Sequence, residues 1–194
     1  MYFMVQRIFW VYWLLKTQIL YKRYFGSVGR RSRIIRPLKL RNMKNIFIGN
    51  RVTINKYTWL MTLPLEGNQI PRMIIGDDCE IGHYNHISCV NSVVIGPKVL
   101  TADGVHISDN GHGYEDPRVA IIDQPILSKG PVIIGEGTWL GENVNVISCR
   151  IGRNCVIGAN AVVVRDIPEF SVAVGVPAQV IKRFNQKSGK WDKI

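Results

Sequence analysis

The sequence predicts an all-β protein, a parallel β-helix of hexapeptide repeats with an N-terminal helix and one extruded loop. Along residues 131–167 the aliphatic side chains recur in steps of six, six, five, six and six, at Ile134, Leu140, Val146, Ile151, Ile157 and Val163. Glycine follows four of them, at positions 135, 141, 152 and 158. A helix requires spacings of three and four, and a hairpin requires plain alternation, so neither explains this period. Six-residue units, each a short strand and a tight turn, stack into a β-helix with one continuous core.

The charge of the chain is unevenly distributed. A length of 194 residues with 46% hydrophobic residues suits one globular domain. Residues 1–65 contain 13 Lys/Arg and no Asp/Glu, whereas the other 129 contain 12 Lys/Arg and 14 Asp/Glu, which gives the net +11. Such a basic block attracts phosphate groups of nucleic acid, anionic lipid or a phosphorylated carrier. No recognition helix or base-stacking motif accompanies it, so nucleic acid is not an expected partner.

The cysteines indicate reduced thiols. Cys79, Cys89, Cys149 and Cys155 form no CxxC pair and no metal-like grouping with histidine, so we expect buried thiols and no metal site. No cleavable signal is apparent, because the first apolar run ends at Lys16 without a small-residue cleavage site. We therefore expect a cytoplasmic location.

Residues 1–45 form a basic, aromatic N-terminal segment, and its first 25 residues are expected to be helical. Its longest uninterrupted apolar run, Ile8–Leu15, is far shorter than the roughly 20 residues that span a bilayer. The helix can pack on the β-helix or on a neighbouring subunit. Alternatively it lies in a membrane interface, with Trp10 and Trp13 at headgroup level. The basic run over residues 30–44 slightly favours the membrane.

Residues 46–184 are assigned to the β-helix, and residues 185–194 to a polar tail. The hexads of the early part are less regular, and between positions 108 and 130 the repeat stops. That segment is rich in Gly, Pro, Asp and Asn in turn-forming combinations. A loop of about 20 residues inside a compact domain is usually functional or disordered. We interpret loop 108–130 as an arm that reaches over a site.

The arm carries the histidine best suited to catalysis. His112 lies in the sequence NGHG, whereas His83, His86 and His106 fall within the repeats. An imidazole is the side chain best matched to accepting a proton at neutral pH. Asp109, three residues earlier, could orient the imidazole ring or could simply cap the turn.

The runs TWLGENVNV, IGRNCVIGANAVVVRDIP and VAVGVPAQVIKRF closely resemble the hexapeptide-repeat acyltransferases. Within them the chain looks like the O-acetyltransferases of the galactoside/maltose and polysaccharide-modifying branch, over residues from about 46 to 184. The resemblance implies a left-handed β-helix and a homotrimer with active sites between adjacent subunits. One departure is VISCRIG, residues 146–152, which is one residue shorter than the usual pattern and is expected to distort one corner.

The resemblance also implies acetyl-CoA as co-substrate, lying in the groove between two prisms. Trp139 matches the tryptophan beside the acetyl-bearing arm, small residues match positions along the pantetheine, and basic residues match positions that meet the phosphates. These expected coenzyme-binding residues are Trp139, Gly141, Ala159, Ala161, Arg165, Lys182 and Arg183.

For the acceptor side, the resemblance implies that His112 serves as general base, with Asp109 beside it. Some members of the branch carry DHxHG, but here only His112 stands in the matching place, preceded by Asn110. We expect Asn85, His86 and Asn110 to contact the acceptor.

The expected function is acetyl-CoA-dependent O-acetylation of a sugar hydroxyl of a bacterial surface polysaccharide, O-antigen or capsule, or of its lipid-linked precursor. Two alternatives stay open: N-acetylation of an amino-sugar nucleotide, and a non-catalytic trimeric scaffold. The basic N-terminus predicts peripheral contact with the inner face of the plasma membrane.

Overall fold

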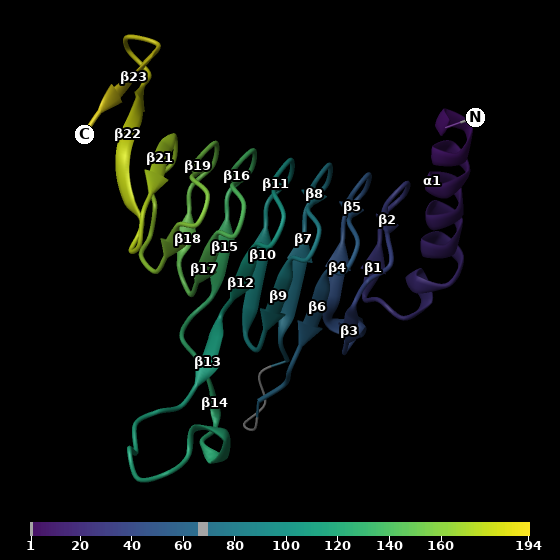
Figure 1. Cartoon of the computed structure of the whole chain (residues 1–194), viewed down its shortest axis with the longest axis horizontal. Helices are drawn as coiled ribbons and strands as arrows, with labels where there is room; N and C mark the ends of the chain where they lie inside the picture. Colours follow the sequence, from purple (N-terminus) through teal and green to yellow (C-terminus); the bar gives the residue numbers. More distant parts are fainter. Residues whose placement is uncertain (1, 66–69) are drawn as a thin grey trace.

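The structure is a computed structural model that describes residues 2–65 and 70–194. Within these ranges the chain winds around three parallel sheets, which form the sides of a prism (Figure 1). Sheet A consists of β1 (Ser27–Val28), β4 (Ile46–Ile48), β7 (Arg72–Ile75), β10 (Ser92–Ile95), β15 (Val132–Ile134) and β18 (Arg150–Ile151). Sheet C consists of β3 (Lys39–Arg41), β6 (Trp59–Thr62), β9 (His86–Cys89), β12 (His106–Ser108), β17 (Asn145–Ile147) and β20 (Val162–Val163).

Sheet B is the longest of the three. Its parallel strands are β2 (Arg33–Ile34), β5 (Thr53–Ile54), β8 (Glu80–Ile81), β11 (Leu100–Thr101), β16 (Trp139–Leu140), β19 (Val156–Ile157) and β21 (Ser171–Val174). Two antiparallel strands, β22 (Gln179–Asn185) and β23 (Lys190–Lys193), extend it at the C-terminal end. The segment expected to be a polar tail therefore contributes a strand.

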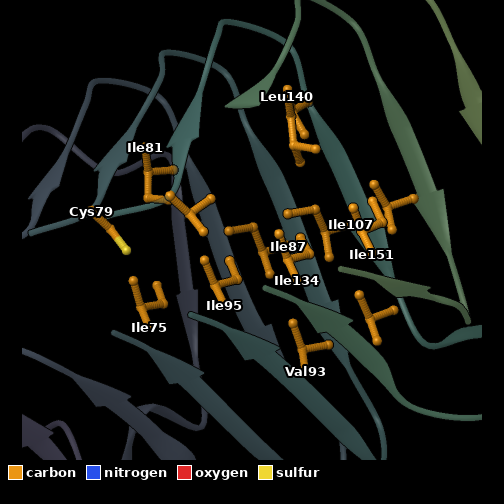
Figure 2. Packing of buried hydrophobic residues seen from close by; sticks show 14 of the residues in the cluster. Ile75, Cys79, Ile81, Ile87, Val93, Ile95, Ile107, Ile134, Leu140 and Ile151 are labelled. Carbon is orange, nitrogen blue, oxygen red and sulfur yellow. The ribbon is translucent and has the colours of Figure 1, made fainter. Parts of the chain in front are cut away.

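The aliphatic residue of each hexad points into the prism, as its period predicts (Figure 2). Each lies in register with its counterparts on the neighbouring coils, as in the pairs Ile95↔Ile134 and Ile107↔Val146. From Ile54 to Val163 these side chains are at most 1% exposed, so the stacked coils share one dry core.

The coils begin earlier than residue 46. Strands β1, β2 and β3 already form a complete coil within residues 27–41. Val28, Ile34 and Leu40 provide its hexad residues in steps of six, and Val28 and Ile34 are fully or almost fully buried. Basic residues and an incomplete glycine pattern conceal this repeat in the sequence.

Helix α1 (Tyr2–Ile19) closes the open end of this first coil. Two polar side chains of the helix join it to the coil backbone: Thr17 Oγ1 accepts the N–H of Ile34 at 2.9 Å, and the Gln18 amide donates to the carbonyl of Gly29, also at 2.9 Å. Trp13, on the same side of α1, is 5% exposed. One face of α1 thus packs on the β-helix, which is the first of the two positions expected for this helix. No described helix is both long enough and apolar enough to cross a membrane.

The arm departs from the prism between β12 and β15, where the repeat stops (Figure 1). It contains an antiparallel pair, β13 (Asn110–His112) and β14 (Ile126–Ser128). Turns and the short 3-10 helix η3 (Ile121–Asp123) connect the two strands. Two further 3-10 turns, η1 (Tyr21–Arg23) and η2 (Met43–Asn45), lie before the second coil.

The shortened corner VISCRIG leaves both adjoining sheets in register. Ser148 turns the chain with a φ of 46°, and Cys149 points inward at 3% exposure. Ile151 still pairs with Ile134, and Val146 with Ile107. Strand β18, which follows the corner, is two residues long, as β1 of the same sheet is.

Candidate active site

An outward row of side chains crosses the C-terminal half of sheet B. The strand registers place Trp139 beside Val156, Val156 beside Val172, and Val172 beside Lys182. Trp139 is 48% exposed, so much of its indole ring is accessible to a ligand. With strands about 4.8 Å apart, the row covers roughly 14 Å from an indole to an ammonium group. An extended chain with an anionic end fits this surface.

The three small residues expected to line the coenzyme do not all lie on the surface. Gly141 lies in the next coil corner, where a Cβ would come within 2.7 Å of the Ala159 backbone nitrogen, so the stacking of coils requires glycine. Ala159 is exposed at that corner. Ala161 is 0% exposed and belongs to the core, so its expected contact with the coenzyme is not available. Some residues at the coil corners point into the core and others point outward. The hexad spacing alone does not show which residues do which.

The three basic residues expected to bind the coenzyme phosphates do not all lie on one face of the prism. Arg165 is exposed in the turn after β20. Lys182 and Arg183 are neighbours on β22, and successive side chains of a strand point to opposite faces. Lys182 pairs with the outward Val172, whereas Arg183 pairs with the inward Ser171. Only Lys182 therefore shares the face that carries Trp139.

His112 lies on the arm, exposed at the end of β13 and paired with Ile126. The backbone of the next residue is fixed to the opposite strand, because the Gly113 N–H donates to the Pro125 carbonyl at 2.7 Å. The arm leaves from the end of a sheet C strand, while Trp139 faces outward from sheet B, and Figure 1 shows β13 and β16 on opposite sides of the prism. One chain does not bring the imidazole and the indole together.

Asp109 anchors the base of the arm. Its side chain is 0% exposed, and its carboxylate accepts the backbone N–H groups of Val90, Asn91 and Ser92, each at 2.8 Å. Asn110 donates to the same carboxylate at 3.0 Å. Of the two roles considered for Asp109, the geometry within one chain supports capping of the turn.

The expected acceptor residues are only partly accessible. Asn85 is 0% exposed, and its amide donates to the carbonyls of His83 and Ala102, so it stabilises a corner and cannot reach a sugar. Asn110 is half-buried and donates to Ser88 Oγ at 3.2 Å, over the outer face of sheet C. His86 is half-buried on that same face.

A row of rings on sheet C, formed by Trp59, His86 and His106, was not recognised in the sequence. Its ring centroids are 4.6 and 5.1 Å apart. Burial lowers the pKa of both histidines. The neighbouring His106 and Lys39 lower the pKa of His86 further, whereas a hydrogen bond with Asn145 partly offsets the lowering for His106. All three residues begin a strand of sheet C, and this shared position was the signal available in the sequence.

The cysteines are poor nucleophiles. Burial raises the pKa of Cys79 and of Cys149 to about 11 and that of Cys89 to about 12. Burial raises the pKa of Cys155 as well. Because the thiolate is the reactive form, these thiols are inert at neutral pH.

No protein-family model matches the chain. It is 37% identical over 172 residues to the putative lipopolysaccharide biosynthesis O-acetyl transferase WbbJ of Escherichia coli K12, covering 84% of this chain and 85% of the relative. The chain belongs to the hexapeptide-repeat O-acetyltransferases.

Solved structures agree on the fold, the left-handed parallel β-helix. The N-acyltransferase AntD from Bacillus cereus, in complex with dTDP and coenzyme A, superposes with a TM-score of 0.72 at 20% identity, covering 88% of this chain and 90% of AntD. A hexapeptide-repeat acetyltransferase of Vibrio cholerae complexed with acetyl coenzyme A gives a TM-score of 0.57 at 23% identity. This chain is an acyltransferase.

Proposed function

We propose that the protein transfers the acetyl group of acetyl-CoA to a sugar hydroxyl of a bacterial surface polysaccharide, O-antigen or capsule, or of its lipid-linked precursor. The observation that carries the proposal is the 37% identity to a putative lipopolysaccharide O-acetyltransferase along almost the whole chain. The exposed Trp139 row and the projecting His112 provide the two halves of a site that this reaction needs.

The site is completed between subunits of a homotrimer. Strands β16 and β13, which carry Trp139 and His112, lie on different sides of one prism, so a neighbouring copy has to supply one of the two side chains. Flat-sided prisms pack side by side with three-fold symmetry, and an arm that projects from one prism can reach the sheet B face of the next. Acetyl-CoA then lies along the row from Trp139 to Lys182, with its phosphates toward Lys182 and Arg165.

The reaction is a direct transfer in a ternary complex. The imidazole of His112 removes the proton of the sugar hydroxyl while that oxygen forms a bond to the thioester carbonyl carbon. A backbone N–H stabilises the oxyanion of the tetrahedral intermediate. The carbon–sulfur bond then breaks, and the departing thiolate takes the proton from His112. No covalent acyl-enzyme is required, which is consistent with the high pKa values of the buried thiols.

N-acetylation of an amino-sugar nucleotide is the second candidate, because AntD is an N-acyltransferase with a TM-score of 0.72. The identity to AntD is only 20%, and sequence similarity favours a hydroxyl acceptor. A non-catalytic scaffold does not agree with the family assignment.

The decisive experiment is a calorimetric titration of acetyl-CoA into the purified protein, with light scattering for the oligomeric state, followed by transfer assays. Binding of one acetyl-CoA per subunit of a trimer, with turnover on a hydroxyl sugar acceptor, supports the proposal. Turnover on amino-sugar nucleotides alone would move the assignment to N-acetylation. A well-folded trimer that binds no acetyl-CoA would refute it.

The enzyme acts in the cytoplasm at the inner face of the plasma membrane, where a lipid-linked acceptor is accessible. Support comes from residues 1–65, which contain 13 Lys/Arg and no Asp/Glu. Anionic lipids attract such a segment by about 1 kcal/mol per basic residue near the surface.

A further inference from the structure

The side of α1 that faces away from the prism is apolar. Its members recur with the three- and four-residue spacing of one helix face, and each is at least 52% exposed. They are Ile8, Val11, Tyr12, Leu15 and Ile19. At about 100° per residue they occupy an arc of roughly 100°, the width that a globular protein normally turns to its core. This outward face of α1 touches no other part of the described chain closely enough to be covered.

The opposite side of α1 fixes the orientation of the helix. Trp13 and Thr17 lie on that side and are buried against the first coil. The Thr17–Ile34 hydrogen bond, and the Gln18–Gly29 hydrogen bond at the edge of the apolar arc, prevent the helix from rotating. The apolar face is therefore held outward and cannot turn into the chain's own core.

The charge around this face is positive and lacks internal compensation. On the helical wheel Arg7 and Lys16 lie on either side of the apolar arc, and Lys22 and Arg23 follow at the end of the helix. Within the described parts of the chain, no Lys or Arg before Arg51 forms an ion pair with a carboxylate. Exposed arginines of the first coil extend the basic surface.

The position of α1 distinguishes a membrane from a subunit as the occupant. The hydrogen bonds of α1 are with the first coil, and its N-terminal half also reaches the second coil, where Lys56 Nζ lies 5.4 Å from the centre of the Phe9 ring. The helix as a whole lies at the end of the prism and not along one of its flat sides (Figure 1). Prisms that pack side by side cover their sides and leave their ends open. A trimer with parallel axes would present three copies of α1 at one end.

We infer that the outward face of α1 inserts into the headgroup region of an anionic lipid monolayer, with the prism axis along the membrane normal. Apolar side chains enter the acyl boundary, and the flanking basic residues contact lipid phosphates. This inference rests on the proposed membrane contact and specifies which surface makes it. The insertion of three helices side by side rests on the proposed homotrimer. The arms and the Trp139 rows then stand above the membrane, within reach of an acceptor whose lipid is embedded in it.

The test uses the full-length protein and vesicles of phosphatidylcholine with or without about 30% phosphatidylglycerol. The double substitution Leu15→Glu/Ile19→Glu should lower the partition coefficient onto the anionic vesicles at least about tenfold, because two carboxylates replace apolar groups in the interface. Ile194→Glu, at an apolar position that is 73% exposed at the opposite end of the chain, should change it less than about twofold. Equal partitioning of both variants would overturn the inference.

A second variant tests the contribution of the basic residues separately from that of the apolar face. Lys22→Glu/Arg23→Glu leaves the apolar face intact and should weaken binding to the anionic vesicles at least about fivefold, with little change on neutral ones. Light scattering and acetyl-CoA titration of all variants keep the two proposals apart. Loss of vesicle binding with trimer and coenzyme binding intact supports membrane insertion. A change of oligomeric state in Leu15→Glu/Ile19→Glu would instead assign this face to contact between copies and overturn the inference.

Discussion

The coils and the arm differ in how their side chains are held. In the coils, Ile107 and Leu140 are 0% exposed, and parallel neighbours fix them on both sides. In the arm, His112 and Leu127 lie on an isolated antiparallel pair and are exposed. The periodic part can hold an extended ligand along one straight row of residues. The aperiodic part can extend a reactive group beyond its own prism, so the two halves of the site can belong to different chains.

The largest effect should come from removing the reactive group of the arm. His112→Ala should lower kcat by roughly 10²–10⁴-fold, because no other described side chain of the arm is matched to accept the proton at neutral pH. The melting temperature should stay the same, since the imidazole is exposed. Steady-state kinetics with saturating acetyl-CoA measures the effect, and His83→Ala, which removes a half-buried imidazole of the coils paired with Asp103, is the control. A loss under tenfold would reject His112 as the base.

The two regions should respond differently to the same truncation. Leu140→Ala removes a fully buried side chain from the stacked core and should reduce the free energy of unfolding by about 2–5 kcal/mol. Leu127→Ala truncates a leucine in the arm that is 40% exposed and should cost less than about 1 kcal/mol. Denaturant titration of both variants provides the comparison. Equal losses would show that the arm is as cooperative a part of the fold as the coils.

A smaller effect separates the two faces of β22. Lys182→Ala should raise the KM for acetyl-CoA about three- to tenfold, because its ammonium shares the face of Trp139. Arg183→Ala, on the opposite face, should change that KM less than about twofold. Initial rates over a range of acetyl-CoA concentrations give the KM of each variant. A larger increase in KM for Arg183→Ala than for Lys182→Ala would place the coenzyme on the other face of β22.

The smallest effect concerns pH. Burial lowers the pKa of His106 below its usual 6.5, so the unfolded chain binds the proton more readily than the folded one. The contribution to stability is complete above pH 6.5 and is lost as the pH falls below it toward the folded pKa. Thermal melts at pH 7.5 and pH 5 should therefore show a smaller decrease for His106→Gln than for the unchanged protein. An identical decrease would assign the acid sensitivity to other groups.

The coils could be predicted because each six-residue unit carries an aliphatic residue at its buried position, and this pattern can be recognised within the unit itself. The first coil was missed although Val28 and Ile34 keep the six-residue step, since the arginines around them masked it. Ala161 and Asn85 look accessible by spacing, but both turn inward at corners, and that direction depends on backbone angles that the period does not specify.

The candidate site was harder to predict than the fold. His112 and Trp139 could be selected from the sequence, and both are exposed as a site requires. The role of Asp109 depends on three amides about 18 residues earlier, contacts that only the stacking of β9 and β12 creates. The alternation on β22 that separates Lys182 from Arg183 was likewise invisible before the strand pairings were known.

The β22–β23 hairpin has a consequence for the length of the particle. A stack of parallel coils could in principle grow into a fibre, because its last open edge would accept the first strands of another copy. Here sheet B reverses strand direction at β22 and ends in β23, whose four residues are all exposed and include two lysines and an aspartate. At the other end α1 covers the first coil. Both ends of the coil stack are thus covered by other elements, which disfavours end-to-end growth into a filament.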